Sequence, residues 1–447
     1  MNLDAWLSLL EQRHPQTIDL GLGRCGSVYK RMGSPRPANR VYTVAGTNGK
    51  GSTVAYLAAM CGGLGQTYGT FTSPHIFRFN ERICVMGEPV SDDRLIKAFE
   101  HVEAAREGVS LTYFEFTTLA GMLILNQSEL DCAVLEVGLG GRLDTVNLVD
   151  ADCAVITPIG LDHQEFLGSD LNTIAAEKAG IIRAGVPVVC TERNPPAPVI
   201  QTAEKLRAPL VQRGKDFDLA PHPDPENELI RFSIGEQSML VSPPSMKGEH
   251  QLDNLAAALA ALLMLNPGYM TGADEISAAI RACRLPGRFQ SVCDSPEIIL
   301  DVGHNPLAAK ALAAFLEEKQ RSNTICVLSM LADKPAGVVA TTMDHVCKHW
   351  LCADSKGPRG QTGDRLAERL KTALPDAQIS AFGPLDDAIQ AALSMVGEHE
   401  TILVFGSFLT VSAAADFLNN SLQHDRHDAD RITSDESGRN PREKTNG

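Results

Sequence analysis

Short apolar, β-branched runs alternate along this chain with longer segments whose apolar positions follow a helical spacing. The runs at 40–46, 131–141 and 153–160 resemble buried strands, and each ends in a loop that contains glycine. Segments 50–65 and 248–265 have helical spacing instead. Because strands that alternate with helices usually form a parallel sheet, the pattern predicts an α/β protein.

The pattern restarts after "RLPGRFQ" (284–290), where proline and glycine break a helix. We therefore expect a P-loop ATPase-type N-terminal domain at 1–287, with a mostly parallel sheet, and a smaller Rossmann-like C-terminal domain at 288–420. The expected strands of the second domain lie at 297–303, 324–331, 349–354, 377–383 and 401–408.

Two segments lack this alternation. Residues 210–248 are rich in Pro, Asp and Glu and predict a β-hairpin on the surface of the first domain. Residues 421–447 are polar and aperiodic, which predicts a disordered tail.

Composition narrows the class of protein. The formal net charge of −15 argues against binding to nucleic acid or to anionic membranes, which requires a basic surface. The 11 cysteines include no C-x-x-C pair, and they predict reduced, buried thiols without a disulfide framework or zinc cluster. The N-terminus carries acids and does not resemble a signal peptide, and no apolar run could span a bilayer. We expect a cytoplasmic protein.

The stretch "VAGTNGKGS" (44–52) departs from the Walker A pattern, because position 44 is valine and Gly51 follows Lys50. It nevertheless follows a strand, opens a helix and contains three glycines and a lysine, the features that a phosphate loop needs. Ser52 supplies a hydroxyl that could face a metal. An ordinary strand-to-helix connection with a surface lysine is the alternative.

Two other strands end in polar groups. Glu136 ends the run "CAVLE", and Asp162 and His163 follow the run at 153–160. The carboxyl ends of parallel strands meet at one edge of a sheet, where ligands bind. One carboxylate with phosphate oxygens suffices for Mg²⁺, so Glu136 is a candidate metal ligand. The alternatives are an exposed glutamate at a strand end and a histidine that packs or caps a helix.

The chain resembles the folylpolyglutamate synthase/dihydrofolate synthase family of the Mur ligase superfamily. Eleven blocks in order carry the resemblance: "TIDLGLGR" (17–24), "GTNGKGS" (46–52), "TSPH" (72–75), "NERI" (80–83), "TYFE" (112–115), "LEVGLGGRLDTVN" (135–147), "LDHQEFLG" (161–168), "EKAGI" (177–181), "HQLDN" (250–254), "LPGRFQ" (285–290) and "DVGHNP" (301–306). The Lys-Gly-Ser order of the loop is typical of the folate branch, whereas cell-wall ligases have Thr or Ser directly after the lysine.

The resemblance implies an ATP-dependent ligase. ATP phosphorylates a substrate carboxylate, and the amine of L-glutamate attacks the acyl phosphate. Metal ions and a lysine are needed because two anions must meet. The implied substrates are 7,8-dihydropteroate and tetrahydrofolate glutamates, so that one chain carries both synthase activities.

The resemblance also implies roles for individual residues. The residues implied to bind ATP are Asn48, Gly49, Lys50, Gly51, Ser52, Asn254, Arg288 and Asp301. The implied ligands of two magnesium ions are Ser73, Glu136, His163 and Lys178, the last as a CO₂-derived carbamate. From the sequence alone Lys178 could equally be a solvated lysine of a helix. Lys50, Lys178 and His304 are the implied catalytic residues, and closure of the two domains is expected to complete the site.

The implied pteroate segments are "TYFE" and "RLDT". Their residues are Thr112, Tyr113, Phe114, Glu115, Leu143, Asp144 and Thr145. Phe114 is expected to stack on the pterin and Asp144 to accept its ring N–H groups. Core packing is the alternative for Phe114.

Two rival functions remain open. The chain could be a Mur-type ligase acting on another carboxylate, or a non-ligase nucleotide-binding protein that hydrolyses ATP slowly. The Lys-Gly-Ser loop and the pteroate segments argue against the first rival, and the presence of Arg288 and Asp301 argues against the second. The resemblance implies a monomer and leaves open whether K⁺ also binds.

Overall fold

The computed structural model describes residues 1–447 except 17, 223, 225–227, 322, 398–399 and 421–447. The tail expected to be disordered therefore lies outside the described residues. The chain forms two compact units. Unit 1 comprises Met1–Phe289 and Asn305–Phe315, and unit 2 comprises Gln290–His304 and the residues from Leu316 onward. The first change of unit lies at the C-terminal end of the expected junction at 284–290.

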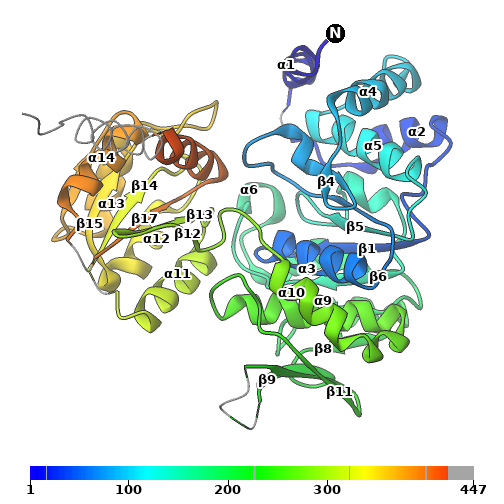
Figure 1. The fold of residues 1–447 in the computed structure, drawn as a ribbon. Helices are drawn as coiled ribbons and strands as arrows, with labels where there is room; N and C mark the ends of the chain where they lie inside the picture. Colours follow the sequence, from blue (N-terminus) through cyan, green and yellow to red (C-terminus); the bar gives the residue numbers. More distant parts are fainter. Residues whose placement is uncertain (17, 223, 225–227, 322, 398–399, 421–447) are drawn as a thin grey trace, which may run out of the picture. The chain divides into compact units, whose positions relative to one another are not determined.

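An eight-stranded sheet forms the centre of unit 1 (Figure 1). Its strands are β1 (Arg40–Ala45), β2 (Tyr68–Phe71), β3 (Ile83–Val85), β4 (Glu88–Pro89), β5 (Cys132–Glu136), β6 (Cys153–Ile156), β7 (Val188–Cys190) and β8 (Leu210–Gln212). They follow the order β4-β3-β2-β5-β1-β6-β7-β8, in which the β2–β3 and β3–β4 pairs are antiparallel and the other pairs are parallel. The predicted α/β class with a mostly parallel sheet is confirmed.

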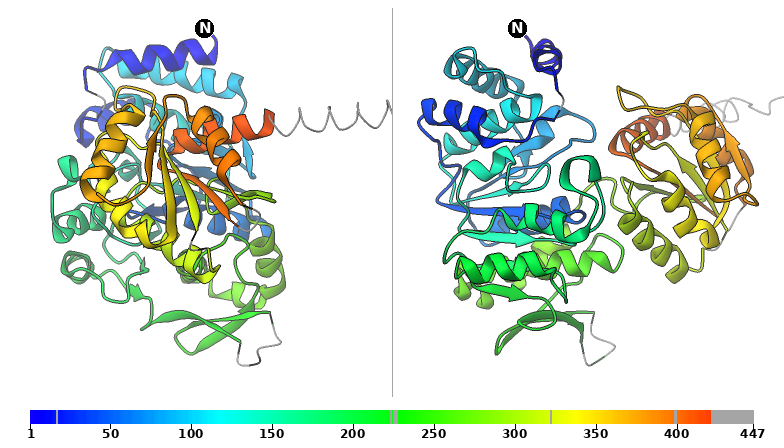
Figure 2. Two further views of the ribbon diagram at one scale, coloured as in Figure 1. Left: turned by 90° about the vertical axis from the view of Figure 1, so that its left-hand side faces the viewer. Right: turned by 180° about the vertical axis from the view of Figure 1, so that it is seen from behind.

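Helices cover both faces of this sheet (Figure 2). The helices of unit 1 are α1 (Leu3–Arg13), α2 (Leu22–Arg31), α3 (Lys50–Gly63), α4 (Asp92–Arg106), α5 (Tyr113–Asn126), α6 (Gln164–Leu167), α7 (Leu171–Ala179), α8 (Ala197–Lys205), α9 (His250–Leu265) and α10 (Ala273–Ala282), with the 3₁₀ helices η1 (Phe79–Arg82), η2 (Thr145–Leu148) and η3 (Pro267–Thr271). Because side chains alternate along a strand, Tyr42 and Val44 of β1 pack with α3, α9 and α10. Val41 packs in the opposite layer with α1, α2, α4 and α5.

Segment 210–248 differs from the expected surface hairpin. Its first residues form β8 of the main sheet, and the rest forms a separate antiparallel sheet of β9 (Phe217–Pro221), β10 (Ile230–Ile234) and β11 (Gln237–Val241). Phe217, Phe232 and Val241 are buried in the cluster that contains α9. The weak alternation of this segment therefore reflects one face that packs on the core.

Unit 2 contains a six-stranded sheet in the order β12-β13-β17-β14-β15-β16. Its strands are β12 (Gln290–Asp294), β13 (Glu297–Asp301), β14 (Thr324–Leu328), β15 (Cys347–Cys352), β16 (Ile379–Ala381) and β17 (Thr401–Phe405). The helices of this part of the chain are α11 (Pro306–Glu318), α12 (Ala336–Met343), α13 (Gly363–Ala373), α14 (Leu385–Met395), a helix at 408–420 and the 3₁₀ helix η4 (Asp344–Val346). Only β12 pairs antiparallel, and the sequence did not predict this edge strand.

One expectation about the cysteines is wrong. Cys326 of β14 and Cys347 of β15 form a disulfide between neighbouring strands, whereas the other nine cysteines are free. The two residues lie 21 positions apart in separate strands, and only the pairing of those strands brings them together. Within the described residues, no helix has the length and apolar character needed to cross a membrane.

Candidate functional site

The loop between β1 and α3 has the backbone of a phosphate cradle. Gly49 caps α3 in the left-handed region, with φ of +85°. A Cβ added there would lie 2.2 Å from Oδ1 of Asn254, so only glycine fits. Nζ of Lys50 folds back and donates to the carbonyl oxygens of Gly46 and Thr47, at 3.0 and 3.1 Å. The loop thus places a cation and the first N–H groups of α3 together, which suits a phosphate group.

Residues after β6 hold this loop in place. Oγ1 of Thr157 donates to the carbonyl oxygen of Asn48 at 2.7 Å. The N–H of Thr47 donates to the carbonyl oxygen of Pro158 at 2.8 Å, and its hydroxyl exchanges hydrogen bonds of 3.0 Å with the backbone of Gly160. These hydrogen bonds fix the shape of the loop, which favours a phosphate-binding loop over an ordinary strand-to-helix connection.

The first turn of α9 contributes a polar network to the same place. Gln251 is fully buried and donates through Nε2 to Oγ of Ser52 at 3.4 Å. Its Oε1 accepts from Nδ2 of Asn254 at 3.1 Å. Gln251 was missed from the sequence, although it belongs to the quoted block "HQLDN" and lies on the same helix as Asn254.

Glu136 ends β5 next to the segment that contains Ser73. Its side chain accepts a hydrogen bond from the N–H of Ser73 at 3.2 Å, and the residue is only 6% exposed. Burial raises the pKa of this carboxyl, while the charges of Lys50, Arg288 and Arg82 act in the opposite direction. The alternative of an exposed glutamate at a strand end is wrong.

Arg288 lies close to these groups. A Cβ on Gly51 would lie 3.5 Å from Nη2 of Arg288 and 3.8 Å from Oε2 of Glu136. Gly51 therefore lies beside both the carboxylate and the guanidinium.

Lys178 is buried against the phosphate loop. It lies in the last turn of α7, is 3% exposed, and its Nζ donates to the carbonyl oxygen of Gly46 at 2.9 Å. Burial lowers the pKa of this amine to about 7, and the charge of Lys50 adds to the effect, while Asp162 opposes it. The alternative of a solvated helix lysine is wrong.

His163 and Asp162 lie in the loop after β6, as expected. His163 caps the short helix α6 with φ of +51°, and Oδ2 of Asp162 accepts from Nδ2 of Asn305 at 3.1 Å. No three His, Cys, Asp or Glu side chains of the described residues cluster as a metal site. The backbone of Ser73 and the side chain of Glu136 are brought together, and a carboxylate fits Mg²⁺ when a serine hydroxyl and phosphate oxygens complete the shell.

The predicted pteroate residues lie around the start of α5. The ring of Phe114 lies on Gly138, where an added Cβ would come within 2.5 Å of the ring. Thr112 and Glu115 form a capping box, and Oε1 of Glu115 also accepts from Arg24 at 3.0 Å. Both side chains are therefore committed to the local fold.

Asp144 is buried and caps η2. Its oxygens accept the N–H groups of Val146 and Leu139, both at 2.9 Å. Burial raises the pKa of this carboxyl to about 6, although the backbone bonds lower it. Leu143 is half-buried, and Thr145 is buried beside the thiol of Cys25.

Two further predicted residues belong to unit 2. Asp301 ends β13 and is 5% exposed, and its Oδ1 accepts the N–H of Gly303 at 2.7 Å. Nδ1 of His304 donates to the carbonyl oxygen of Val302 at 2.8 Å. Their contact with ATP after domain closure stays a prediction.

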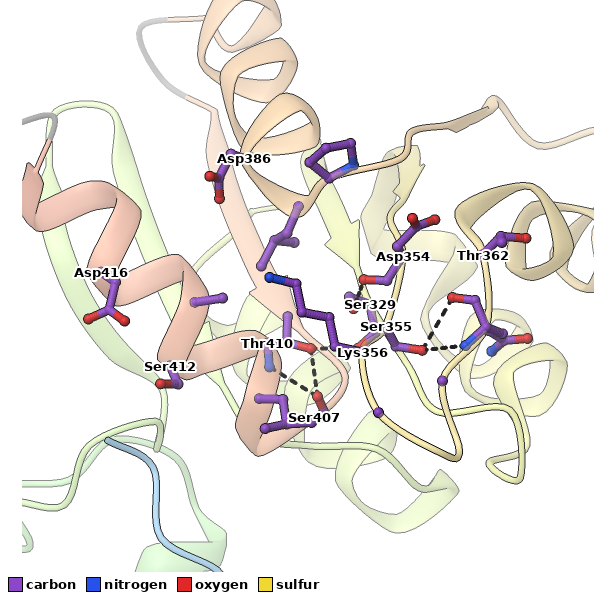
Figure 3. A pocket seen from close by; sticks show the side chains of 17 residues that line it. Ser329, Asp354, Ser355, Lys356, Thr362, Asp386, Ser407, Thr410, Ser412 and Asp416 are labelled. Atoms are coloured by element: carbon purple, nitrogen blue, oxygen red, sulfur yellow. Dashed lines mark hydrogen bonds between the residues drawn. The ribbon is translucent and has the colours of Figure 1, made fainter. Parts of the chain in front are cut away.

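Unit 2 also contains a pocket of about 700 Å³ that the sequence did not predict (Figure 3). It lies at the carboxyl ends of β14, β15, β16 and β17, the edge of a parallel sheet where ligands bind. Lys356 reaches into its middle, and the hydroxyl groups of Ser407 and Thr410 lie 2.7 Å apart on one wall. The other polar side chains that line it are Ser329, Asp354, Ser355, Gln361, Thr362, Asp386, Ser412 and Asp416.

Comparisons with known proteins cover both units. A family model described as "Mur ligase middle domain" matches residues 44–262, and one described as "Mur ligase, glutamate ligase domain" matches residues 287–408. The dihydrofolate synthase/folylpolyglutamate synthase of Escherichia coli K12 is 38% identical over 411 residues, which is 92% of this chain and 94% of the relative.

Solved structures agree with these matches. E. coli FolC in complex with DHPP and ADP has a TM-score of 0.86 at 36% identity, with 94% of this chain and 98% of that chain covered. A bifunctional folylpolyglutamate synthase/dihydrofolate synthase with Mn, AMPPNP and L-glutamate bound has a TM-score of 0.84 at 35% identity, with the same coverage.

Proposed function

Because this chain belongs to the dihydrofolate synthase/folylpolyglutamate synthase family of the Mur ligases, whose members are ATP-dependent ligases, we propose that it attaches L-glutamate to 7,8-dihydropteroate and to tetrahydrofolate glutamates. The observation that carries the proposal is the buried carboxylate of Glu136 next to Ser73, near the cations Lys50 and Arg288. This arrangement suits a phosphoryl group that moves from ATP to a substrate carboxylate.

A carboxylate is a poor electrophile, so the reaction first forms an acyl phosphate. The N–H groups at the start of α3 and Nζ of Lys50 hold the phosphates of ATP. Ser73 and Glu136 would hold a magnesium ion, which would supply positive charge to neutralise the transferring phosphoryl group. The amine of L-glutamate then attacks the acyl carbon, an amide bond forms, and phosphate leaves.

Lys178 takes part as a carbamate. CO₂ reacts with a neutral amine, and the lowered pKa of Lys178 leaves a large share of the amine neutral near pH 7. The carbamate is an anion and supplies oxygen ligands for a second divalent metal, which an ammonium group cannot do. His163 would complete the metal ligands, and K⁺ would be an optional further cation.

The pterin ring lies against Phe114, whose ring contacts Gly138. The oxygens of Asp144 accept backbone N–H groups and still keep a lone pair for a pterin N–H group. Leu143 and Thr145 flank the same place. Thr112 and Glu115 act indirectly, because their capping box fixes the start of α5.

L-Glutamate occupies the pocket of unit 2. Lys356 forms no hydrogen bond or salt bridge with another described residue, so its ammonium group can pair with a glutamate carboxylate. Asp354, Asp386 and Asp416 suit the α-ammonium group, and Ser407 and Thr410 offer further hydrogen bonds (Figure 3).

Lys356→Ala is expected to raise the KM for L-glutamate by about tenfold, because one charge-assisted hydrogen bond is lost. The KM values for ATP and dihydropteroate should not change. Lys348→Ala is the matched control, since Lys348 lies on β15 of the same unit and pairs with Glu400. A glutamate KM that stays at the wild-type value in Lys356→Ala would contradict this assignment.

The proposed activity has a direct test. Purified protein with ATP, Mg²⁺, L-glutamate and 7,8-dihydropteroate should release ADP and form dihydrofolate. Replacing dihydropteroate by a tetrahydrofolate monoglutamate tests the second activity. ADP release that needs neither glutamate nor a pterin substrate would favour the nucleotide-binding rival. ADP release that depends on glutamate but occurs only with another carboxylate substrate would favour a different Mur-type ligase.

The setting of the enzyme is part of the proposal. We place it in the cytoplasm and infer that it acts as a monomer, with small molecules as its partners and neither nucleic acid nor membrane among them. The net charge of −15 supports this setting, because it opposes binding to polyanions.

A further inference from the structure

Arg82 is a buried arginine that forms no salt bridge with the described residues. It ends η1 and is 9% exposed. Its guanidinium carbon lies 5.4 Å from the ring centroid of Phe79 and 5.5 Å from that of Tyr113. Nε donates to Nδ1 of His75 at 3.0 Å, and this is the only hydrogen bond of the Arg82 side chain among the described residues. Arginines are almost never buried in this way unless they are paired.

The surroundings of Arg82 connect two parts of the site. Tyr113 begins α5 and precedes Phe114, which lies on Gly138. His75 lies two residues after Ser73, whose N–H donates to Glu136. Arg82 therefore lies between the pteroate segment and the candidate metal ligands.

The charge balance around Glu136 calls for an additional anion. Lys50, Arg288 and Arg82 all act on this one carboxylate. Lys50 and Arg288 lie at the phosphate loop, beside Gly46 and Gly51, and suit the phosphates of ATP. Arg82 instead contacts His75 of the TSPH segment, so the phosphates of ATP do not account for its buried charge. The two aromatic rings hold its guanidinium in one orientation, which leaves the Nη1 and Nη2 groups as a preformed fork for a carboxylate.

We propose that Arg82 is a catalytic residue that binds the reacting carboxylate of the pteroate or folate substrate through Nη1 and Nη2. The inference rests on the proposed function. One carboxylate oxygen forms a bond to the γ-phosphorus as the bond from that phosphorus to the β-phosphate oxygen breaks, and ADP leaves with the electron pair. Arg82 holds the other oxygen. When the glutamate amine attacks, the C–N bond forms, the bond from carbon to the phosphate oxygen breaks, and the amine proton passes to solvent.

Arg82→Met tests the proposal, because methionine keeps an apolar stem between the two rings and removes the fork. We expect the KM for dihydropteroate to rise and kcat to fall, each by about tenfold or more, with an unchanged KM for ATP. Hydroxylamine added without glutamate traps the acyl phosphate as a hydroxamate, and its yield should fall in parallel. Arg82→Lys keeps the charge without the fork and should give an intermediate loss.

Arg78→Met is the matched control on the same turn, since its side chain is 74% exposed and lies at 3.8 Å from Asp92. It should behave as wild type. A wild-type KM for dihydropteroate and a wild-type hydroxamate yield in Arg82→Met would overturn the inference. A His75→Gln variant that reproduces the whole loss of activity would also overturn it, because Arg82 would then act only by positioning His75. If Arg82→Met does not fold by circular dichroism, Arg82→Lys decides. Failure of the wild-type protein to use either pterin substrate would instead overturn the proposed function.

Discussion

Replacing Lys178 by alanine is expected to lower kcat about 10³-fold for both pterin substrates, because the variant cannot form the carbamate that holds a second metal. Short carboxylic acids should restore part of the activity, since a free carboxylate can enter the space left by the side chain. In the wild-type protein, ¹³C NMR with labelled CO₂ should show a carbamate signal that Lys178→Ala lacks.

Lys205→Ala is the matched control, because Lys205 is an exposed lysine in the last turn of the neighbouring helix α8. It should keep full activity and the carbamate signal. A Lys178→Ala variant with more than a tenth of the wild-type kcat would refute the carbamate role.

The pH dependence follows from the same amine. Burial lowers the pKa of Lys178 to about 7, so the ammonium form predominates below that pH and cannot react with CO₂. Activity at a fixed concentration of dissolved CO₂ should therefore fall as the pH drops from 8 to 6. A rate that rises over this interval would contradict a role for the neutral amine.

The elements of the fold with strong periodicity could be predicted from the sequence. β1, β5 and β6 are buried on both faces, so they are continuous apolar runs that end in polar or glycine residues. The edge strand β12 and the three-stranded sheet of β9, β10 and β11 have weaker patterns, because only part of each is buried. Those are the elements that were missed or described incompletely.

Burial of single polar residues could not be predicted in the same way. Lys178 lies in a short helix directly after Glu177, and the packing of α7 against the phosphate loop makes it a buried amine. The same holds for Gln251, whose partner Ser52 comes from a distant segment, and for Arg82, which packs on Tyr113 of α5. Sequence spacing contains no information about such long-range contacts.

The pocket of unit 2 shows the same limit. Its lining comes from four separate segments, which include the starts of two helices, at the ends of parallel strands, so no continuous motif marks it. Lys356 in "ADSKGPRGQ" has the appearance of an ordinary loop lysine until Asp386, Ser407 and Thr410 surround it.

Glu136→Gln is expected to abolish metal-dependent turnover, with a fall of about 10³-fold in kcat, and yet to leave the fold at least as stable as the wild type. Glutamine keeps an oxygen that can accept the N–H of Ser73 but loses the charge that attracts the metal. Burial raises the pKa of Glu136 above its unfolded value, so at pH 7 the ionised carboxylate costs the metal-free folded state free energy that the neutral amide does not.

The sign of this stability effect distinguishes a functional carboxylate from a structural one. A raised pKa makes the metal-free wild type more stable as the pH falls towards the pKa of the folded state, whereas the stability of Glu136→Gln should lack this dependence. Thermal unfolding at pH 7 and pH 5 without metal, together with steady-state kinetics in Mg²⁺, measures both effects. Glu88→Gln, an exposed glutamate on β4 of the same sheet, should change neither. A residue retained for metal binding is expected to favour activity over stability. If Glu136→Gln instead unfolds at a clearly lower temperature at pH 7 and keeps most of its kcat, the carboxylate stabilises the fold and the metal site lies elsewhere.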